Sequence, residues 1–326
     1  MEYRNLGNTG IRVSAIGYGG WGIGGGWGPT DDAEALRAIA AARDQGVTTF
    51  DTALGYGDGH SEELIGKALA SERPAVVIAS KIPPKTGRWP VLPDQPVEST
   101  FPADWIVECT EQSLRHLGTD YLDLQQLHAW TDAYTYSDEW RSAFERLRQQ
   151  GKIRAYGISS NDWDPYGPVG LAESGRIQTV QVIYNVFEQR PAERLLPAAL
   201  ERHVGILARV PLEEGLLTGA IRPAHRFAEG DWRAEWLTPE RIAAASPRLE
   251  ALDALRGPEH PTLAALALHF ALSHPAVSTV LVGMASARHV AENCAVADML
   301  PLDPATLRAL QSHAWVHGWV YPWLQR

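Results

Sequence analysis

The sequence predicts one α/β domain over residues 1–326, a (β/α)8 TIM barrel with a short N-terminal β-hairpin. Short apolar stretches rich in β-branched residues alternate with amphipathic helical stretches, and the alternation repeats through eight units. The strand stretches are almost continuously apolar, which is typical of parallel strands buried on both faces. A chain of 326 residues with 45% hydrophobic content is long enough for a barrel of this kind.

The chain begins with a predicted hairpin that precedes the barrel. Residues 3–6 and 12–13 flank a Gly-Asn-Thr-Gly turn, and we expect this hairpin to cap the barrel floor. The first barrel strand is expected at 13–18. A glycine-rich loop with Gly20 and Trp21 follows, and its glycines permit close backbone approach to a ligand.

The later units follow in order, with helix starts and stops marked by capping residues, proline and glycine. Strands are expected at 47–51, 75–80, 121–127, 153–158, 179–184, 204–210 and 278–282. Helices are expected at 31–46, 61–69, 102–117, 138–151, 169–173, 192–202, 261–273 and 287–297. The remaining long segment, 211–257, is interpreted as a loop that extends over the active site.

An open doubly wound sheet is the competing architecture. It requires a Gly-rich fingerprint directly after a strand and an acidic residue at the end of the next strand. The loop at residues 20–28 matches GxGxxG only loosely. The sequence therefore favours the closed barrel.

Composition restricts the function classes. A formal charge of −10 without Lys/Arg runs argues against nucleic acid or an anionic membrane as the main partner. Cys109 and Cys294 lack disulfide or metal-ligand spacing, so we expect no metal site and a reducing compartment. No signal segment is evident at the N-terminus, and polar residues and proline interrupt the apolar stretch 262–285. These features predict a cytoplasmic protein without a membrane span.

Four residues with catalytic side chains are expected at one end of the barrel. Asp51, Lys81 and His128 each follow a predicted strand, and Tyr56 lies in the loop after Asp51. Since strand ends meet at the barrel mouth, the four side chains should converge there. A lysine beside a tyrosine favours phenolate and lowers its pKa, a carboxylate can hold the lysine, and an imidazole can orient a carbonyl. Taken singly, each residue also fits a helix cap, a solvated lysine or a hydrogen-bonded loop histidine; their joint placement favours a catalytic site.

Several motifs in order resemble the aldo-keto reductase family, from Arg4 to about Asn293. They are FDTALGYG at 50–57, SE at 61–62, SK at 80–81, LRHLGTDYLDLQQLH at 114–128, GISS at 157–160, VQVIYN at 180–185, PLEEGLLTG at 211–219 and GMASARHVAEN at 283–293. The resemblance implies a barrel that binds a nicotinamide cofactor without a Rossmann domain. It also implies a catalytic tetrad of Asp51, Tyr56, Lys81 and His128, with Tyr56 as the general acid in carbonyl reduction.

The resemblance further implies a set of cofactor-binding residues. Ser159, Ser160 and Gln181 are expected at the carboxamide, and Pro211, Leu212 and Gly215 along the pyrophosphate. The complete set is Gly20, Trp21, Asp51, Ser159, Ser160, Gln181, Arg209, Pro211, Leu212, Gly215, Gly283, Ser286, His289, Glu292 and Asn293.

Two departures from the family pattern concern the cofactor. Arg209 stands where many members place an aromatic ring, and Gly283 and His289 replace basic residues that commonly grip a 2′-phosphate, for which Arg288 is a candidate substitute. NADP(H) is favoured because the family usually uses it, and NAD(H) stays possible.

The substrate site is expected to include Trp21, Tyr56, Trp89 and His128. Aromatic walls suit small aldehydes, ketones and sugar-like carbonyls alike. Other aromatic candidates for the mouth are Trp130, Trp315, Trp319, Tyr321 and Trp323.

Two other functions compete with carbonyl reduction. One is a nicotinamide-binding accessory protein resembling the potassium-channel β subunits. The other is a cofactor-free barrel hydrolase or lyase that uses Asp51 and His128.

Overall fold

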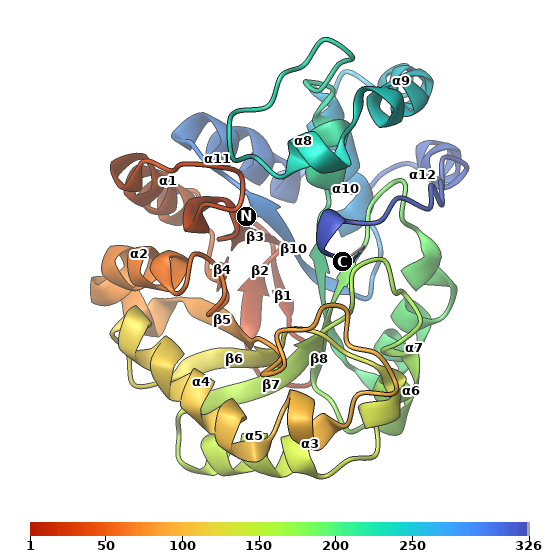
Figure 1. Cartoon of the computed structure of the whole chain (residues 1–326). Coiled ribbons are helices and arrows are strands. Elements are labelled where there is room, and N and C mark those ends of the chain that lie inside the picture. Colours follow the sequence, from red (N-terminus) through yellow and green to blue (C-terminus); the bar gives the residue numbers. More distant parts are fainter. Residues whose placement is uncertain (325–326) are drawn as a thin grey trace.

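Eight parallel strands form a closed barrel in the computed structural model, which describes residues 1–324 (Figure 1). The strand order around the ring is β10-β3-β4-β5-β6-β7-β8-β9. The barrel strands are β3 Ile16–Gly19, β4 Thr49–Asp51, β5 Val77–Ile82, β6 Leu122–Leu127, β7 Ile153–Ser159, β8 Thr179–Ile183, β9 Gly205–Arg209 and β10 Val277–Gly283. The closed ring confirms the predicted barrel and excludes the open sheet.

Helices surround the ring, as the alternating pattern predicted (Figure 1). They are α1 Asp32–Asp44, α2 His60–Leu69, α3 Val97–Thr100, α4 Ala103–Leu117, α5 Glu139–Gln149, α6 Val169–Ser174, α7 Leu195–Arg202, α8 Arg233–Trp236, α9 Pro239–Asp253, α10 Leu263–Leu272, α11 Ala287–Cys294 and α12 Pro304–Gln311.

The segment 211–257 is not the continuous loop that the sequence predicted. It contains α8 and the 15-residue helix α9. The start of α9 is clear in retrospect, because the Thr238 side chain accepts a hydrogen bond from the backbone of Arg241 and Pro239 occupies the first turn. Pro247 within the helix and a weakly amphipathic, Ala-rich sequence concealed it.

The N-terminal hairpin closes the barrel floor. β1 (Tyr3–Asn5) pairs antiparallel with β2 (Arg12–Ser14), which confirms the hairpin. The expected single strand at 13–18 is wrong, since the chain breaks between β2 and β3 and only β3 enters the barrel. Leu6, Ile11 and Val13 pack beneath the ring in one buried apolar cluster.

The inner face of the barrel changes from apolar residues near the hairpin to polar residues or glycine near the mouth. The cluster that contacts the hairpin includes Ala79, Leu124 and Leu207. Since side chains alternate between the two faces of a strand, the inner positions two residues further along carry the next layer. That layer is Lys81, Gln126, Gly157, Arg209 and Gly283. The barrel therefore has an apolar floor below a polar mouth.

No helix within residues 1–324 is long and apolar enough to cross a membrane.

Candidate active site

The Lys81 ammonium joins three of the predicted residues at the barrel mouth. Its Nζ donates hydrogen bonds to Asp51 Oδ2 at 2.6 Å, to the Tyr56 hydroxyl at 3.1 Å and to the Thr52 carbonyl oxygen at 2.7 Å. The side chain is fully buried. An ammonium has three N–H donors, so all of them are used, and the desolvated charge lies beside a carboxylate.

His128 completes the constellation from the end of β6. Its ring meets the Tyr56 ring edge to face, with 5.6 Å between centroids. Burial, with the charges of Lys81 and Arg209, holds the pKa of His128 well below its ordinary 6.5. The imidazole is therefore neutral at physiological pH, and it can donate one N–H to a carbonyl oxygen.

Burial decides the direction of the tyrosine pKa. It raises the pKa of Tyr56 above its ordinary 10.0, and the opposing charge of Lys81 offsets only part of that rise. The expectation of a net lowering was thus wrong, because it omitted the desolvation of the phenolate. For Lys81, burial lowers the pKa, but Asp51 and Tyr56 more than offset this effect, so the ammonium stays protonated.

Two tryptophans border the tetrad where the sequence placed the substrate pocket. The Trp21 ring lies edge to face on Tyr56 at 4.9 Å between centroids, and the Trp89 ring lies edge to face on His128 at 5.0 Å. Trp130 does not belong to the mouth. It is fully buried and packs against Tyr134 and Trp140 in the core.

Residues at the ends of β7 and β8 contact the tetrad from one side. Gln181 Nε2 donates to Asp51 Oδ1 at 2.8 Å, and the Ser160 backbone N–H donates to the Gln181 carbonyl oxygen at 2.9 Å. Ser159 ends β7 and is buried. Within residues 1–324 the buried Ser160 hydroxyl has no hydrogen-bond partner. A bound carboxamide would satisfy that hydroxyl, so this end of the site fits a nicotinamide.

Arg209 enters the mouth from the end of β9, and its partner is a residue that the sequence reasoning missed. Its Nη2 lies 2.9 Å from Asp162 Oδ1 and donates to the Ser160 carbonyl oxygen at 3.2 Å. The other carboxylate oxygen of Asp162 accepts from the indole N–H groups of Trp89 at 2.8 Å and Trp323 at 3.1 Å. Asp162 therefore connects the end of β9, the loop after β5 and the C-terminal tail.

Gln126 is a second residue that was missed. It pairs in register with Lys81 on the neighbouring strand, it is fully buried, and neither polar atom of its side chain has a partner in the described part of the chain. Two adjacent glutamines, Gln125 and Gln126, in a strand predicted to be buried were the available signal.

The turn after β9 has an unusual backbone. Val210, Glu213 and Glu214 have φ angles of 54°, 49° and 53°, and Gly215 has 99°. Left-handed conformations cost energy for residues with a Cβ, most of all for a β-branched one. Such conformations concentrate at functional sites, which agrees with the place assigned to Pro211, Leu212 and Gly215 on the cofactor path.

Glycines on two segments leave room beside the mouth. A Cβ on Gly20 would lie 2.6 Å from Ser61 Oγ, and a Cβ on Gly283 would lie 2.8 Å from the Trp27 ring. Glycine at position 20 thus permits close approach to the Asp51 backbone, and glycine at position 283 leaves space for the Trp27 ring. Ser61 does not open α2 as expected, because α2 begins at His60 and the buried Ser61 hydroxyl donates to the Gly20 carbonyl oxygen.

The segment expected at the adenosine end forms the start of α11. The Ser286 hydroxyl caps this helix by accepting from the His289 backbone N–H at 3.3 Å. Asn293 is buried, whereas Glu292 is exposed, and its Oε1 lies 3.4 Å from Nη1 of the still more exposed Arg288.

Comparisons with known proteins agree with this geometry. The family model described as "Aldo/keto reductase family" matches residues 15–314 of this chain. Aldo-keto reductase YhdN of Bacillus subtilis (strain 168) is 39% identical over 71% of this chain and 68% of its own length. The NADH-specific methylglyoxal reductase of Escherichia coli (strain K12) is 30% identical over 90% and 93%. Among solved structures, the glycerol dehydrogenase AKR11B4 from Gluconobacter oxydans superposes with a TM-score of 0.78 at 27% identity, over 95% of this chain and 94% of that one. The chain thus belongs to the aldo/keto reductase family of NAD(P)(H)-dependent oxidoreductases.

Proposed function

We propose that the protein interconverts a small carbonyl compound and its alcohol by hydride transfer, with Tyr56 as the general acid and base. The observation that carries the proposal is the contact of Lys81 Nζ with both the Tyr56 hydroxyl, at 3.1 Å, and Asp51, at 2.6 Å. A half-buried tyrosine beside a permanently charged ammonium can release a proton to substrate, because the cation stabilises the phenolate that remains.

Each member of the tetrad has a distinct task in this proposal. When bound, the nicotinamide supplies or accepts the hydride. Tyr56 protonates the carbonyl oxygen, Lys81 stabilises the resulting phenolate, and Asp51 keeps Lys81 charged and in position. The neutral His128 donates an N–H to the same oxygen and orients the carbonyl. Trp21 and Trp89 cover the reacting atoms and reduce access of water.

The cofactor in this proposal is NADP(H), with NAD(H) as the alternative. Ser160, Gln181 and Arg209 would hold the nicotinamide end, the turn at 211–215 the pyrophosphate, and the start of α11 the adenosine. The remaining members of the set are Gly20, Trp21, Asp51, Ser159, Gly283, Ser286, His289, Glu292 and Asn293. Arg288 is the candidate for contact with a 2′-phosphate, because its guanidinium is exposed on α11, where Glu292 is its partner at 3.4 Å. The NADH-specific relative is the reason to keep both cofactors in the test.

Small substrates are favoured over bulky ones. Three tryptophans lie close to the reacting groups. The Trp21 ring contacts Tyr56, the Trp89 ring contacts His128, and the Trp323 indole donates to Asp162. The names of two similar proteins, a methylglyoxal reductase and a glycerol dehydrogenase, refer to three-carbon compounds. We therefore place methylglyoxal and glyceraldehyde first among the substrates to be tested.

Cofactor binding followed by turnover tests the proposal. Tryptophan emission should be quenched by NADPH or NADH, and nicotinamide absorbance should then fall with a panel of aldehydes and ketones. Tyr56→Phe should keep the cofactor affinity and lose most of the reduction. Unchanged turnover in this variant would remove Tyr56 from the acid role.

The same measurements separate the competing functions. Cofactor binding without turnover of any carbonyl would favour the nicotinamide-binding accessory protein. Absence of cofactor binding would reject both of these functions and leave a hydrolase or lyase. A cytoplasmic location and a single domain over residues 1–326 stay predictions.

A further inference from the structure

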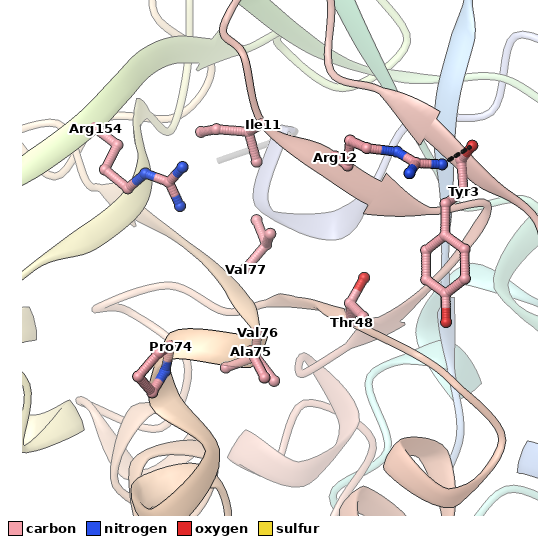
Figure 2. A pocket seen from close by; sticks show the side chains of 9 residues that line it. All are labelled: Tyr3, Ile11, Arg12, Thr48, Pro74, Ala75, Val76, Val77 and Arg154. Atoms are coloured by element: carbon pink, nitrogen blue, oxygen red, sulfur yellow. Dashed lines mark hydrogen bonds between the residues drawn. The ribbon is translucent and has the colours of Figure 1, made fainter.

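A pocket of about 360 Å³ opens at the floor of the barrel, where the strands begin (Figure 2). The hairpin contributes Ile11 and Arg12, the residue before β4 contributes Thr48, and the starts of β5 and β7 contribute Val77 and Arg154. The tetrad lies at the opposite ends of these strands. The pocket is therefore separate from the site proposed for the nicotinamide reaction, and its volume lies in the range of small-molecule sites.

Two arginines at this end of the barrel share one carboxylate. Arg154 Nη1 lies 2.6 Å from Asp123 Oδ1, and Arg73 Nη1 lies 2.8 Å from Asp123 Oδ2. Asp123 Oδ2 also accepts from the backbone N–H of Ile78 at 3.0 Å. Both oxygens of this fully buried carboxylate are thus occupied, while Arg154 is half exposed and retains N–H donors for another partner.

Arg12 adds a charge that no carboxylate balances. It forms no ion pair within residues 1–324; its Nη2 donates to the Tyr3 carbonyl oxygen at a long 3.4 Å, and its guanidinium lies 5.9 Å from the centre of the Tyr3 ring. Arg73 and Arg154 thus share Asp123, and Arg12 adds a third guanidinium that has no carboxylate partner within residues 1–324. The floor therefore carries an excess of positive charge in a chain whose formal charge is −10.

An apolar surface separates the two arginines of the pocket. Figure 2 shows Arg154 and Arg12 on opposite sides of Ile11 and Val77, with Thr48 on the side of Arg12. A ligand with an oxyanion and an apolar body matches this arrangement: guanidinium groups pair with oxyanions in fork geometry, and the aliphatic side chains cover the body.

We propose that this floor pocket, lined by Ile11, Arg12, Thr48, Val77 and Arg154, binds a small organic anion, a phosphate monoester or carboxylate with an apolar body. The inference does not depend on the nicotinamide reaction, because it uses none of the residues at the mouth.

Methyl NMR of the full chain with phenyl phosphate and with benzoate tests the proposal. Saturable shifts are expected for Ile11 and Val77, and the tighter of the two probes identifies the head group. Phenol, which lacks the charge, should cause much smaller shifts. Ile23, in the loop beside Tyr56, reports the mouth. Shifts at Ile23 without shifts at Ile11 and Val77 would assign the probes to the mouth and overturn the proposal, as would the absence of saturation.

Variants connect the shifts to the arginines. The double variant Arg12→Gln/Arg154→Gln should weaken binding by about tenfold or more, because each lost guanidinium contact is a charge-assisted one. Asp123 keeps Arg73 and the Ile78 N–H in this variant, so the fold should survive, and the exposed Arg308→Gln on α12 is the matched control. Ala75→Trp, at an exposed position that lines the pocket, should block binding by filling it. Unchanged affinity in the double variant or in Ala75→Trp would reject the floor pocket as the site.

Discussion

The Arg209 guanidinium lies 2.9 Å from the Asp162 carboxylate, whose side chain is only 7% exposed. The charge of Arg209 helps to lower the pKa of His128 and opposes the burial that raises the pKa of Tyr56. Asp162, which pairs with Arg209, therefore determines how much unbalanced positive charge Arg209 brings to the mouth.

Asp162→Asn should change the charge preference of the substrate site. Loss of the carboxylate leaves the positive charge of Arg209 without a partner. The kcat/KM for an anionic aldehyde should therefore rise relative to that for a neutral aldehyde of similar shape. We expect the ratio of kcat/KM for 4-carboxybenzaldehyde over benzaldehyde to rise by about tenfold, or about 1.4 kcal/mol. This is less than the ~4 kcal/mol of a charge pair in contact near a protein surface, because the interaction weakens with distance. Asp120→Asn, at an exposed position, is the control. An unchanged ratio would show that Arg209 does not face the substrate.

Lys81→Met should destabilise the fold as well as abolish turnover. The substitution leaves the buried Asp51 carboxylate without its cation, which costs about 3–5 kcal/mol in comparable pairs. Adding Asp51→Asn should recover part of the free energy of unfolding, measured by denaturant titration, without restoring activity. If the double variant is no more stable than Lys81→Met, the two side chains are not coupled.

Glu214 should make stability depend on pH near neutrality. Burial, together with Glu213 and Asp162, raises the pKa of Glu214 from 4.5 to about 7, against the hydrogen bond from Tyr321 and the charge of Arg233. The folded state then binds a proton more tightly than the unfolded state. The resulting stabilisation is complete below pH 4.5 and is lost as the pH rises through about 7.

Glu214→Gln removes this dependence, because glutamine still accepts the Tyr321 hydrogen bond without a charge. Relative to the wild type, the Tm of the variant should be higher at pH 8 and show no such gain at pH 5. Glu235→Gln, at an exposed position, should show no such difference. A Tm difference that is the same at both pH values would contradict the assigned titration.

Arg288→Ala should weaken the binding of NADPH but not that of NADH. If the guanidinium contacts a 2′-phosphate, the Kd for NADPH rises by about tenfold, as expected for one charge-assisted contact, while the Kd for NADH stays the same. Fluorescence titration with each cofactor measures both values, and Arg308→Ala is the control on another helix. Equal changes for NADPH and NADH would reject the contact.

The barrel and the tetrad were predictable because they depend on local patterns. Each strand and helix carries its own periodicity, and a closed parallel ring brings the residue after each strand to one mouth. Asp51, Lys81 and His128 could therefore be grouped without knowledge of any side-chain contact.

The contacts of Asp162 could not be predicted in this way. Trp323 lies 161 positions further along the chain, and the tail that carries it has no regular periodicity. Which of the twelve tryptophans reach the mouth is decided by tertiary packing, which places Trp130 in the core and Trp323 against Asp162. The left-handed backbone at Val210 and Glu214 could not be predicted either, because neither position is a glycine, the residue that usually indicates such a conformation.

The apolar floor and the polar mouth are only two residues apart along the strands, so the strand register determines which side chains line the site. A slip of one residue in any strand would turn Lys81, Gln126 or Arg209 toward the helices and bring a core side chain into the mouth. A closed ring has no free edge at which such a slip can be absorbed, because every strand is paired on both sides. All eight strands together therefore hold the tetrad in alignment. A mutation far from the mouth that loosens one strand pairing should lower turnover before it unfolds the chain.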